Sequence, residues 1–375
     1  MAYHGSNNPS RLGLDATGSA GNEDLFLKVF SGEVLTTFEA NNAMLPLTRQ
    51  RTISNGKTAQ FPVTGVAAAT YHTPGESLFA DEQTSDDPLY LSKVNHSERT
   101  IAIDGVLTSS AFLANIDEAK NHYEVRSIYS TEIGRQLAYT ADKNIIRTVI
   151  GGARTSTDRF GTVAATTDAQ IASPYLGGSL FLDGSTGDAG GTHQIGGIGD
   201  NDAAVEGSEW VLGIFKMAEL MDMKNVPQEG RFVMMPPAEY YKLITENTDA
   251  INRDFNPEGN GSIASGEVVS VAGCTILKSN HVPSTDESSD TGIHTHTSIN
   301  NNLFGANSGY GAADFSGTIG IGFQLEAVGT VKLLDLAMES EYMMERLGTL
   351  LMARYAMGHG VLREEACYEF SSITA

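Results

Sequence analysis

Cysteine and basic residues are both scarce in this chain. Its two cysteines, Cys274 and Cys367, form no CxxC pair and are too few for a disulfide framework, so secretion is disfavoured and a reducing compartment is expected. The chain has 24 lysine and arginine residues against 46 aspartate and glutamate residues, a formal net charge of -22. Because this charge repels nucleic acid and anionic membranes, a sequence-reading DNA-binding protein is not expected.

Long apolar runs are also missing. No stretch approaches about 18 consecutive apolar residues, the minimum for a membrane-spanning helix. Residues 1 to 24 are rich in glycine, serine and asparagine and lack a basic start followed by an apolar run, so no signal peptide is expected. With 375 residues the chain is long enough to bury one large or two modest cores. We therefore expect a globular fold that does not cross a membrane.

Several elements are predicted in the first third of the chain. Residues 23 to 39 have helical apolar spacing and predict a short amphipathic helix. Asn55-Gly56 is the strongest short-range signal for a tight hairpin turn, so strands are expected on both sides of it. Ile101 and Ile103 alternate with less apolar neighbours, which indicates a strand returning from a long excursion.

This excursion has an uneven distribution of charge. Between Lys57 and Lys93 there is no basic residue, and acidic side chains accumulate there: Glu76, Asp81, Glu82, Asp86 and Asp87. The two limbs at its base carry basic side chains instead: Arg49, Arg51, Lys57, Lys93 and Arg99. A protruding hairpin with opposite charges at its tip and its root is suited to pairing with a copy of itself on a neighbouring molecule. The alternative is an ordinary solvated loop.

One long helix is predicted from Ile116 to about Val149, where no proline occurs and apolar or small residues recur every three or four positions. At about 1.5 Å per residue it would extend roughly 50 Å, more than a compact domain needs. Its small residues, Ser127, Ser130 and Gly134, would allow another backbone to approach closely. The pattern is typical of a long helix that supports the rest of a fold.

After the predicted long helix, glycine-rich segments alternate with segments that predict helices and strands. Residues 155 to 207 and 284 to 318 are dominated by small and polar residues and are interpreted as long loops or short-stranded insertions. Between them the sequence predicts a helix starting near Trp210, a buried strand from Phe232 to Met235, and a helix opened by Pro236-Pro237. Strands and helices are intermixed without regular βαβ repeats, so the predicted class is α+β.

Candidate chemical sites are weak throughout. Glu118 and His122 lie four residues apart on the predicted long helix, but a helical-bundle metal centre also needs Glu-x-x-His pairs on partner helices, and none is present. The alternative is that both side chains lie on a structural surface of this helix. His294 and His296 would share a metal with Asp290 if they lay on one side of a strand. The competing interpretation is an exposed loop.

No catalytic motif emerges either. The octamer RTISNGKT matches only the end of a phosphate-binding P-loop, because Arg51 stands where that motif needs glycine. His281 and His359 lack an accompanying nucleophile motif. We predict no enzyme activity, no cofactor and no metal site. A β-rich metal- or carbohydrate-binding module remains the alternative function.

The order of several sequence blocks is more informative. The chain contains, in this order, FLKVFSGEVLTTF, RTISNGKTAQFPVTG, YHTPGESL, TIAIDGVLT, NIDEAKNHYEVRSIYSTEIGRQLAYTAD, AVGTVKLLDLAME and ARYAMGHGVLREEA. This series resembles the major capsid proteins of T7-like short-tailed bacteriophages, podoviruses with cyanophages among them. Residues 24 to 150 and 326 to 366 carry most of the resemblance, and the central part follows the family in pattern.

The resemblance implies the tailed-phage capsid fold, in which an arm, an extended β-hairpin loop, a peripheral domain and an axial domain are combined. It places the amino-terminal arm at 1–48, the extended loop at 49–105, the peripheral domain at 106–209 with its spine helix at about 115–150, the axial domain mainly at 210–330, and a return to the peripheral domain at 331–375. The two glycine-rich stretches depart from the family pattern and are expected to be insertions at the surface or the capsomer centre.

The resemblance also implies a function. Copies of the chain would assemble into hexamers and pentamers that form an icosahedral head around double-stranded DNA, without sequence-specific binding and without a membrane. Assembly on a scaffolding protein in the host cytoplasm, expansion during packaging, a portal protein at one vertex and a decoration protein are part of this expectation, and the chain would reside in the virion. Charged residues of the loop and the spine helix are the candidate subunit contacts: Arg49, Arg51, Lys57, Glu76, Asp81, Glu82, Arg99, Glu118 and His122.

Overall fold

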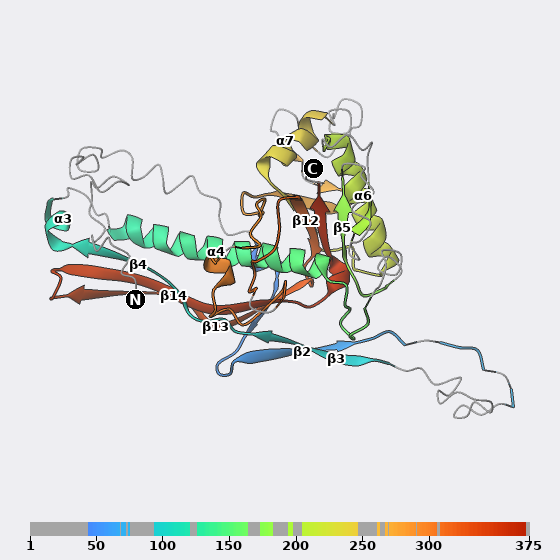
Figure 1. Ribbon diagram of the computed structural model, residues 1–375, viewed down its shortest axis with the longest axis horizontal. Coiled ribbons are helices and arrows are strands. Elements are labelled where there is room, and N and C mark those ends of the chain that lie inside the picture. The colour runs from blue at the N-terminus through green and yellow to red at the C-terminus, as the bar shows by residue number, and fades with distance from the viewer. Residues whose placement is uncertain are drawn as a thin grey trace.

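Two sheets and one long helix form the body of the protein, and a two-stranded hairpin projects from it (Figure 1). A computed structural model describes residues 44–67, 69–72, 74–75, 94–120, 126–163, 173–182, 194–197, 205–246, 261–262, 267–268, 270–289, 291–305 and 308–372. The helix predicted over residues 23 to 39 lies outside these residues, as does most of the predicted arm. Among the described residues, no helix is both long and apolar enough to cross a membrane.

The first sheet has four strands in the order β1-β13-β14-β4. Their bounds are Arg49–Thr52 for β1, Val328–Met343 for β13, Gly348–Val361 for β14 and Leu107–Ala114 for β4. Strands β13 and β14 form a long antiparallel hairpin, and β1 joins β13 in parallel. Alternate side chains of β14 pack against residues of helix α4 (Arg126–Arg154) that recur every four positions: Leu351, Ala353, Tyr355 and Met357 against Ile133, Leu137 and Ala141. Every second side chain of the strand and about every fourth side chain of the helix therefore pack in one core.

The second sheet has seven strands in the order β10-β11-β7-β12-β15-β5-β6. Their bounds are Ser270–Val271, Cys274–Lys278, Arg231–Met235, Thr318–Gln324, Cys367–Ser371, Gly178–Phe181 and Gln194–Gly197, in that order. Helices α6 (Gly207–Met223) and α7 (Pro237–Glu246) lie beside it (Figure 1). Its core contains fully buried aromatic side chains such as Trp210, Phe323 and Phe370.

Helix α4 connects the two sheets. Its first half packs on the four-stranded sheet, whereas Ile145, Ile146, Val149 and Ile150 are fully buried in the core of the seven-stranded sheet. The predicted long helix is present as α3 (Asn115–Lys120) and α4, with residues 121–125 outside the described part of the chain. With 29 residues α4 is about 44 Å long.

Within the subunit, close approach to α4 occurs at Gly152, and approach of another subunit at Gly134 stays a prediction. Within the subunit, a Cβ at Gly134 would meet nothing within 4 Å, whereas one at Gly152 would lie 2.8 Å from Cys367 Sγ. The absence of a side chain at Gly152 lets α4 pack directly on β15 and on Val361. Gly134 therefore leaves an open position on the helix.

The projecting hairpin pairs β2 (Thr58–Thr64) with β3 (His96–Ala102). The predicted returning strand is confirmed. The hairpin predicted at Asn55-Gly56 is wrong, because the strands on its two sides enter different sheets: β1 pairs with β13, and β2 pairs with β3. Gly56 has a φ of 114°, so the sequence signal marks a turn, but its geometry redirects the chain from the body into the projecting hairpin.

The glycine-rich stretches are only partly peripheral. Strand β5, inside the stretch 155 to 207, is buried at every position in the seven-stranded sheet. Gly177 precedes it, and a Cβ there would lie 1.9 Å from the Cys367 carbonyl oxygen. In the stretch 284 to 318, Tyr310 and Phe315 are fully buried. The interpretation of these stretches as surface insertions is therefore wrong for these core-forming residues, whose small neighbours permit tight packing.

The final segment divides between the two sheets. Strands β13 and β14 lie with α4, but β15 lies between β12 and β5 in the seven-stranded sheet. The remaining short elements are a two-stranded pair, β8 (Gly261–Ser262) with β9 (Glu267–Val268), and the 3-10 turns η1 (Leu45–Leu47), η2 (Ile293–Thr295) and η3 (Glu364–Ala366). Turn η3 connects β14 to β15 and thereby connects the two sheets.

Candidate assembly surface

Two of the basic residues predicted at the root of the hairpin, Arg51 and Arg99, lie beside Phe61. Phe61 and Arg99 are direct cross-strand partners in the β2–β3 register, and the Arg51 guanidinium lies 5.6 Å from the centre of the Phe61 ring. Arg51 Nη1 also donates a hydrogen bond to the Gln60 carbonyl oxygen at 2.8 Å. These contacts bring Arg51 and Arg99 to one place although they are far apart in sequence.

The other predicted contact residues are more dispersed. Arg49 Nη1 lies 3.8 Å from Glu326 Oε1 in a largely exposed ion pair, and the Lys57 side chain is exposed. Glu76, Asp81, Glu82 and His122 lie outside the described residues, and so does the side chain of Glu118. Pairing of any of these nine residues between subunits stays a prediction.

A buried pair of glutamates on turn η3 lies at the inner side of the hairpin root. Glu364 is 2% exposed and Glu365 is 1% exposed. Arg99 of β3 forms an ion pair with Glu364. Arg159, which follows α4, places Nη1 3.0 Å from Glu365 Oε1. The turn therefore contacts both the hairpin and the segment that leaves the long helix.

A third arginine extends this cluster to the surface. Arg363 Nε lies 2.9 Å from Glu365 Oε1, and its Nη1 lies 3.1 Å from Glu326 Oε2. Since Glu326 also meets Arg49 of β1, the charges form a continuous series from the solvent to the buried turn. We call Arg99, Arg159, Arg363, Glu364 and Glu365 the η3 cluster.

Some buried polar atoms of the η3 cluster lack hydrogen-bond partners among the described residues. Within the described part of the chain, four of its buried atoms have no hydrogen-bond partner: Arg99 Nε, Arg159 Nε, Glu364 Oε2 and Glu365 Oε2. Burial raises the pKa of Glu364 to about 7, and the charge of Arg99 offsets this rise only in part. The Glu364 carboxylate therefore keeps a substantial desolvation penalty.

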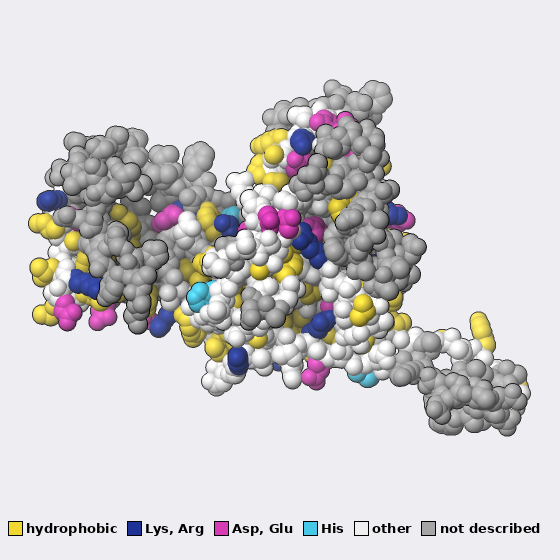
Figure 2. All heavy atoms as spheres, in the orientation of Figure 1, with side chains coloured by type: hydrophobic (Ala, Val, Ile, Leu, Met, Phe, Trp, Pro, Cys, Tyr) yellow, Lys and Arg dark blue, Asp and Glu magenta, His cyan; other side chains and the backbone are white. Residues whose placement is uncertain are grey.

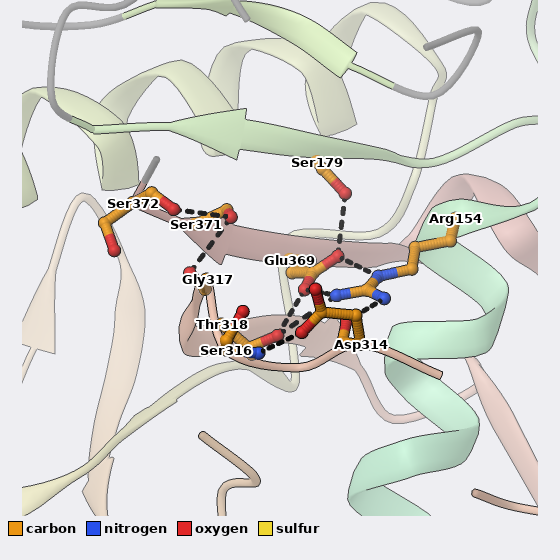
Figure 3. Close-up of polar contacts among 9 residues, drawn as sticks. All are labelled: Arg154, Ser179, Asp314, Ser316, Gly317, Thr318, Glu369, Ser371 and Ser372. Atoms are coloured by element: carbon orange, nitrogen blue, oxygen red, sulfur yellow. Dashed lines mark hydrogen bonds and ion pairs between the residues drawn. The ribbon is translucent and has the colours of Figure 1, made fainter. Parts of the chain in front are cut away.

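A second buried ion pair, between Arg154 and Glu369, is satisfied much more completely (Figure 3). Arg154 donates from Nε to Glu369 Oε2 at 2.8 Å and from Nη2 to Oε1 at 2.6 Å. The same carboxylate accepts hydrogen bonds from Ser179 at 2.8 Å and from Thr318 at 2.6 Å. Although burial alone would raise the pKa of Glu369, these donors and the charge of Arg154 bring it below its usual value. The pair joins the end of α4 to three strands.

The histidines considered as metal ligands or bases have structural partners. His294 is buried, with Nδ1 2.6 Å from Asn144 Oδ1, and burial lowers its pKa to about 3. His296 is exposed, and its Nδ1 accepts from the Ser298 N–H at 3.1 Å. Asp290 lies outside the described residues, among which no group of three or more His, Cys, Asp or Glu side chains could hold a metal ion. His359 Nδ1 lies 3.0 Å from Thr330 Oγ1 inside the core.

Sequence reasoning did not single out the η3 cluster or the Arg154–Glu369 pair. A signal was present in both cases. Arg363, Glu364 and Glu365 are three consecutive charges that follow the apolar end of β14, and Glu369 interrupts the otherwise apolar or small run CYEFS. Charges placed between buried strands indicate paired interior groups.

Comparison with known proteins agrees with this architecture. Residues 60–371 match the model of the family described as Gp10A-like: Major capsid protein. The chain is 30% identical over 347 residues to the major capsid protein of Escherichia phage T7, covering 91% of this chain and 90% of that protein. It is 29% identical over 352 residues to the major capsid protein of Enterobacteria phage T3, again covering 91% and 90%.

Solved capsid structures share the fold. The capsid protein of the cyanophage P-SCSP1u is 37% identical, with a TM-score of 0.70 and coverage of 99% of this chain and 100% of that one. The mature capsid of bacteriophage PhiM1 gives a TM-score of 0.62 at 16% identity, with 96% of each chain covered, which supports the fold alone. The resemblance to T7-like capsid proteins is thus confirmed, and the role is structural rather than enzymatic. This chain belongs to the Gp10A-like family of phage major capsid proteins.

Proposed function

We propose that copies of this chain assemble into hexamers and pentamers that close an icosahedral head around the double-stranded DNA genome of a phage. The projecting β2–β3 hairpin is the observation that carries this proposal (Figure 1). It forms its own two-stranded sheet, and alternate positions of β2 from Thr58 to Thr64 are exposed. Because an isolated two-stranded hairpin is marginally stable in water, a neighbouring subunit is the expected support for it.

The domains of the proposed shell subunit follow the two sheets. We assign the four-stranded sheet and most of α4 to the peripheral domain, the seven-stranded sheet with α6 and α7 to the axial domain, and β2–β3 to the extended loop. The boundaries expected from the sequence change at four strands. We assign β5, β6 and β15 to the axial domain, because they are strands of its sheet, and β1 to the peripheral domain, because it pairs with β13.

The charge of the chain suits an enclosing role. With a net charge of -22, the subunit does not attract DNA as a whole. On the face shown in Figure 2, lysine and arginine side chains of the described residues are scattered among acidic and apolar ones and form no large basic patch. A wall of this kind encloses DNA without binding a particular sequence.

The proposal includes partners and a conformational change. The subunits would first assemble on a scaffolding protein in the host cytoplasm, with a portal protein at one vertex, and the shell would expand as DNA enters. A decoration protein is a further partner in this scheme. Membership in the capsid family and a hairpin that leaves the body through a single root support the proposal, because such a root is a natural hinge.

Electron microscopy tests the assembly. The full-length chain is produced alone and together with the scaffolding protein of its own phage, and both preparations are examined by negative staining. Closed shells containing the chain in at least one preparation are expected. The scaffolding protein alone is the control. A chain that stays strictly monomeric in both preparations would contradict the proposal.

A further inference from the structure

The hairpin is attached to the body by a small apolar contact, by hydrogen bonds and by two polar contacts with turn η3. The hydrogen bonds join Gln60 to Arg51 and Ala102 to Asn301. Ala59, Ile101 and Ile103 pack with Val331, Ala356 and Leu362 at its root. Farther out along the same face of β3, the next inward position is Arg99, which pairs with Glu364. Beyond that point the direction of the hairpin depends on polar contacts.

The second polar contact reaches the other strand indirectly. The Arg159 guanidinium pairs with Glu365 and lies 4.6 Å from the centre of the Tyr175 ring. Tyr175 Oη in turn accepts a hydrogen bond at 3.3 Å from the N–H of Val66, just beyond the end of β2. One buried turn therefore holds β3 through Glu364 and the end of β2 through Glu365.

Stability alone does not account for this arrangement. The η3 cluster buries two adjacent carboxylates and leaves one oxygen of each without a partner among the described residues, whereas the Glu369 carboxylate accepts four hydrogen bonds. Buried ion pairs of this unsatisfied kind are often replaceable by apolar residues with no loss of stability. If apolar residues replaced the two glutamates, the hydrogen bonds that orient the Arg99 and Arg159 side chains would be lost.

We propose that Glu364 and Glu365 form a two-point clamp that sets the direction in which the hairpin leaves the body, with Arg99 and Arg159 as its positioning residues. The inference rests on the proposed role of the hairpin as the extended loop of a shell subunit. In such a shell, the angle of the hairpin determines which part of the neighbouring subunit it reaches. The charged and titratable groups that face Glu364 and Glu365 come from five places in the chain: Arg99 of β3, Arg159 after α4, Lys224 after α6, Arg363 before η3, and Cys367 and Tyr368 of β15.

Distance measurements between spin labels test the clamp directly. Both native cysteines are buried, so labels can be attached to cysteines introduced at the exposed Thr64 on the hairpin and Leu212 on α6. Pulsed electron paramagnetic resonance on the full-length chain then gives the distribution of hairpin-to-body distances. R99Q and R159Q each remove one arm of the clamp. R354Q is the matched control, because it makes the same substitution at an exposed arginine that pairs with Glu339 in the four-stranded sheet.

The wild-type chain and R354Q should give the same narrow distribution, and R99Q and R159Q should each give a distribution about twofold wider or a shifted maximum. The charge-exchanged double variant R99E/E364R should narrow it again. E364Q should also widen the distribution. The double variant R99M/E364M separates positioning from stability: because both charges of the pair are replaced by apolar side chains, it should widen the distribution while the denaturation midpoint at pH 8 stays equal to that of the wild type or rises. Wild-type distributions in R99Q, R159Q and E364Q would overturn the clamp.

The same variants distinguish the clamp from the proposed function. Shell formation by the wild-type chain together with unchanged hairpin distances in R99Q, R159Q and E364Q would reject the clamp and leave the shell proposal standing. Failure of the wild-type chain to form shells, with or without its scaffolding protein, would reject the shell proposal. If R99Q does not fold, as judged by circular dichroism, E364Q and R159Q carry the test.

Discussion

Arg154 at the end of α4 and Glu369 in the middle of β15 are joined by two hydrogen bonds of 2.8 and 2.6 Å (Figure 3). Glu369 is 1% exposed, and Ser179 of β5 and Thr318 of β12 donate to the same carboxylate. The long helix is therefore fixed to the seven-stranded sheet by a buried ion pair with its hydrogen bonds satisfied. This joint should move as one body when the hairpin changes direction.

The first prediction concerns this joint. E369Q keeps the shape of the side chain but leaves the Arg154 guanidinium without a buried counter-charge, so the free energy of unfolding should fall by about 3–5 kcal/mol. Denaturant unfolding of the full-length chain measures the change. E339Q is the control, because Glu339 and Arg354 form an exposed pair at 2.6 Å, which should contribute about 1 kcal/mol or less. Equal effects of the two substitutions would contradict the assignment of Arg154–Glu369 as a structural joint.

The second prediction compares two glycines of α4. G152A places a Cβ 2.8 Å from Cys367 Sγ and should lower the free energy of unfolding by about 1–3 kcal/mol through overpacking. G134A meets nothing within 4 Å inside the subunit and should raise it by roughly 0.5–1 kcal/mol, because alanine has the higher helix propensity.

Denaturation midpoints of the two glycine variants and the wild type check both signs. A destabilised G134A would contradict the finding that a side chain at position 134 has open space within the subunit. If G134A is stabilised as a monomer yet fails to form shells, the face of α4 at Gly134 contacts another subunit, as its small residues predict.

The third prediction concerns acid sensitivity. Burial lowers the pKa of His294 to about 3 in the folded chain, below the ordinary value of 6.5, so the unfolded chain binds this proton first as the pH falls. The stabilising contribution is complete above pH 6.5 and decreases as the pH falls towards the folded pKa. Between pH 7 and pH 5 this one residue should remove about 2 kcal/mol from the free energy of unfolding.

H294N tests the acid sensitivity, because the amide of asparagine can donate to Asn144 Oδ1 in place of the ring N–H without titrating. The variant should lose about 2 kcal/mol less than the wild type between the two pH values. H296N, at an exposed side chain, should keep the wild-type pH dependence. The same pH dependence in H294N and the wild type would show that His294 does not resist protonation.

The fourth prediction concerns the basic root of the hairpin. If its charges join subunits, the double variant R51E/K57E should impair shell closure while the monomer stays folded. Each exposed pair contributes about 1 kcal/mol or less, but the contact is repeated many times in a shell. Shell yield by electron microscopy and monomer folding by circular dichroism are measured together. K216E, at a partly exposed lysine of α6 away from the hairpin, is the control, and normal shells from R51E/K57E would reject this role of the root.

Much of the architecture follows from local sequence patterns. The helix at Trp210, the strand Phe232 to Met235 and the helix opened at Pro237 are present as α6, β7 and α7, because apolar periodicity and proline act over a few residues. The turn at Asn55-Gly56 was also recognisable. The partners of the flanking strands were not recognisable, because β1 pairs with β13 across 280 positions (Arg49 with Gly329) and no local signal specifies that contact.

The polar sites show the same limit. The basic residues Arg51 and Arg99 were singled out from charge alone, but only the register of β2 with β3 shows that both meet at Phe61. Local sequence does not indicate the roles of Glu364, Glu365 and Glu369, because these depend on arginines brought by tertiary contacts from α4, from the segment after α4 and from β3. Glycine-rich composition was misleading at β5, where small residues serve close packing rather than a flexible loop.

Cryo-electron microscopy of the head of the phage that encodes this chain tests the central claim most directly. The account predicts an icosahedral shell whose repeated subunit is this chain, with α4, both sheets and the projecting β2–β3 hairpin traceable in every copy and the hairpin lying on a neighbouring subunit. A shell built from a different polypeptide, or one in which the hairpin contacts no neighbour, would contradict it.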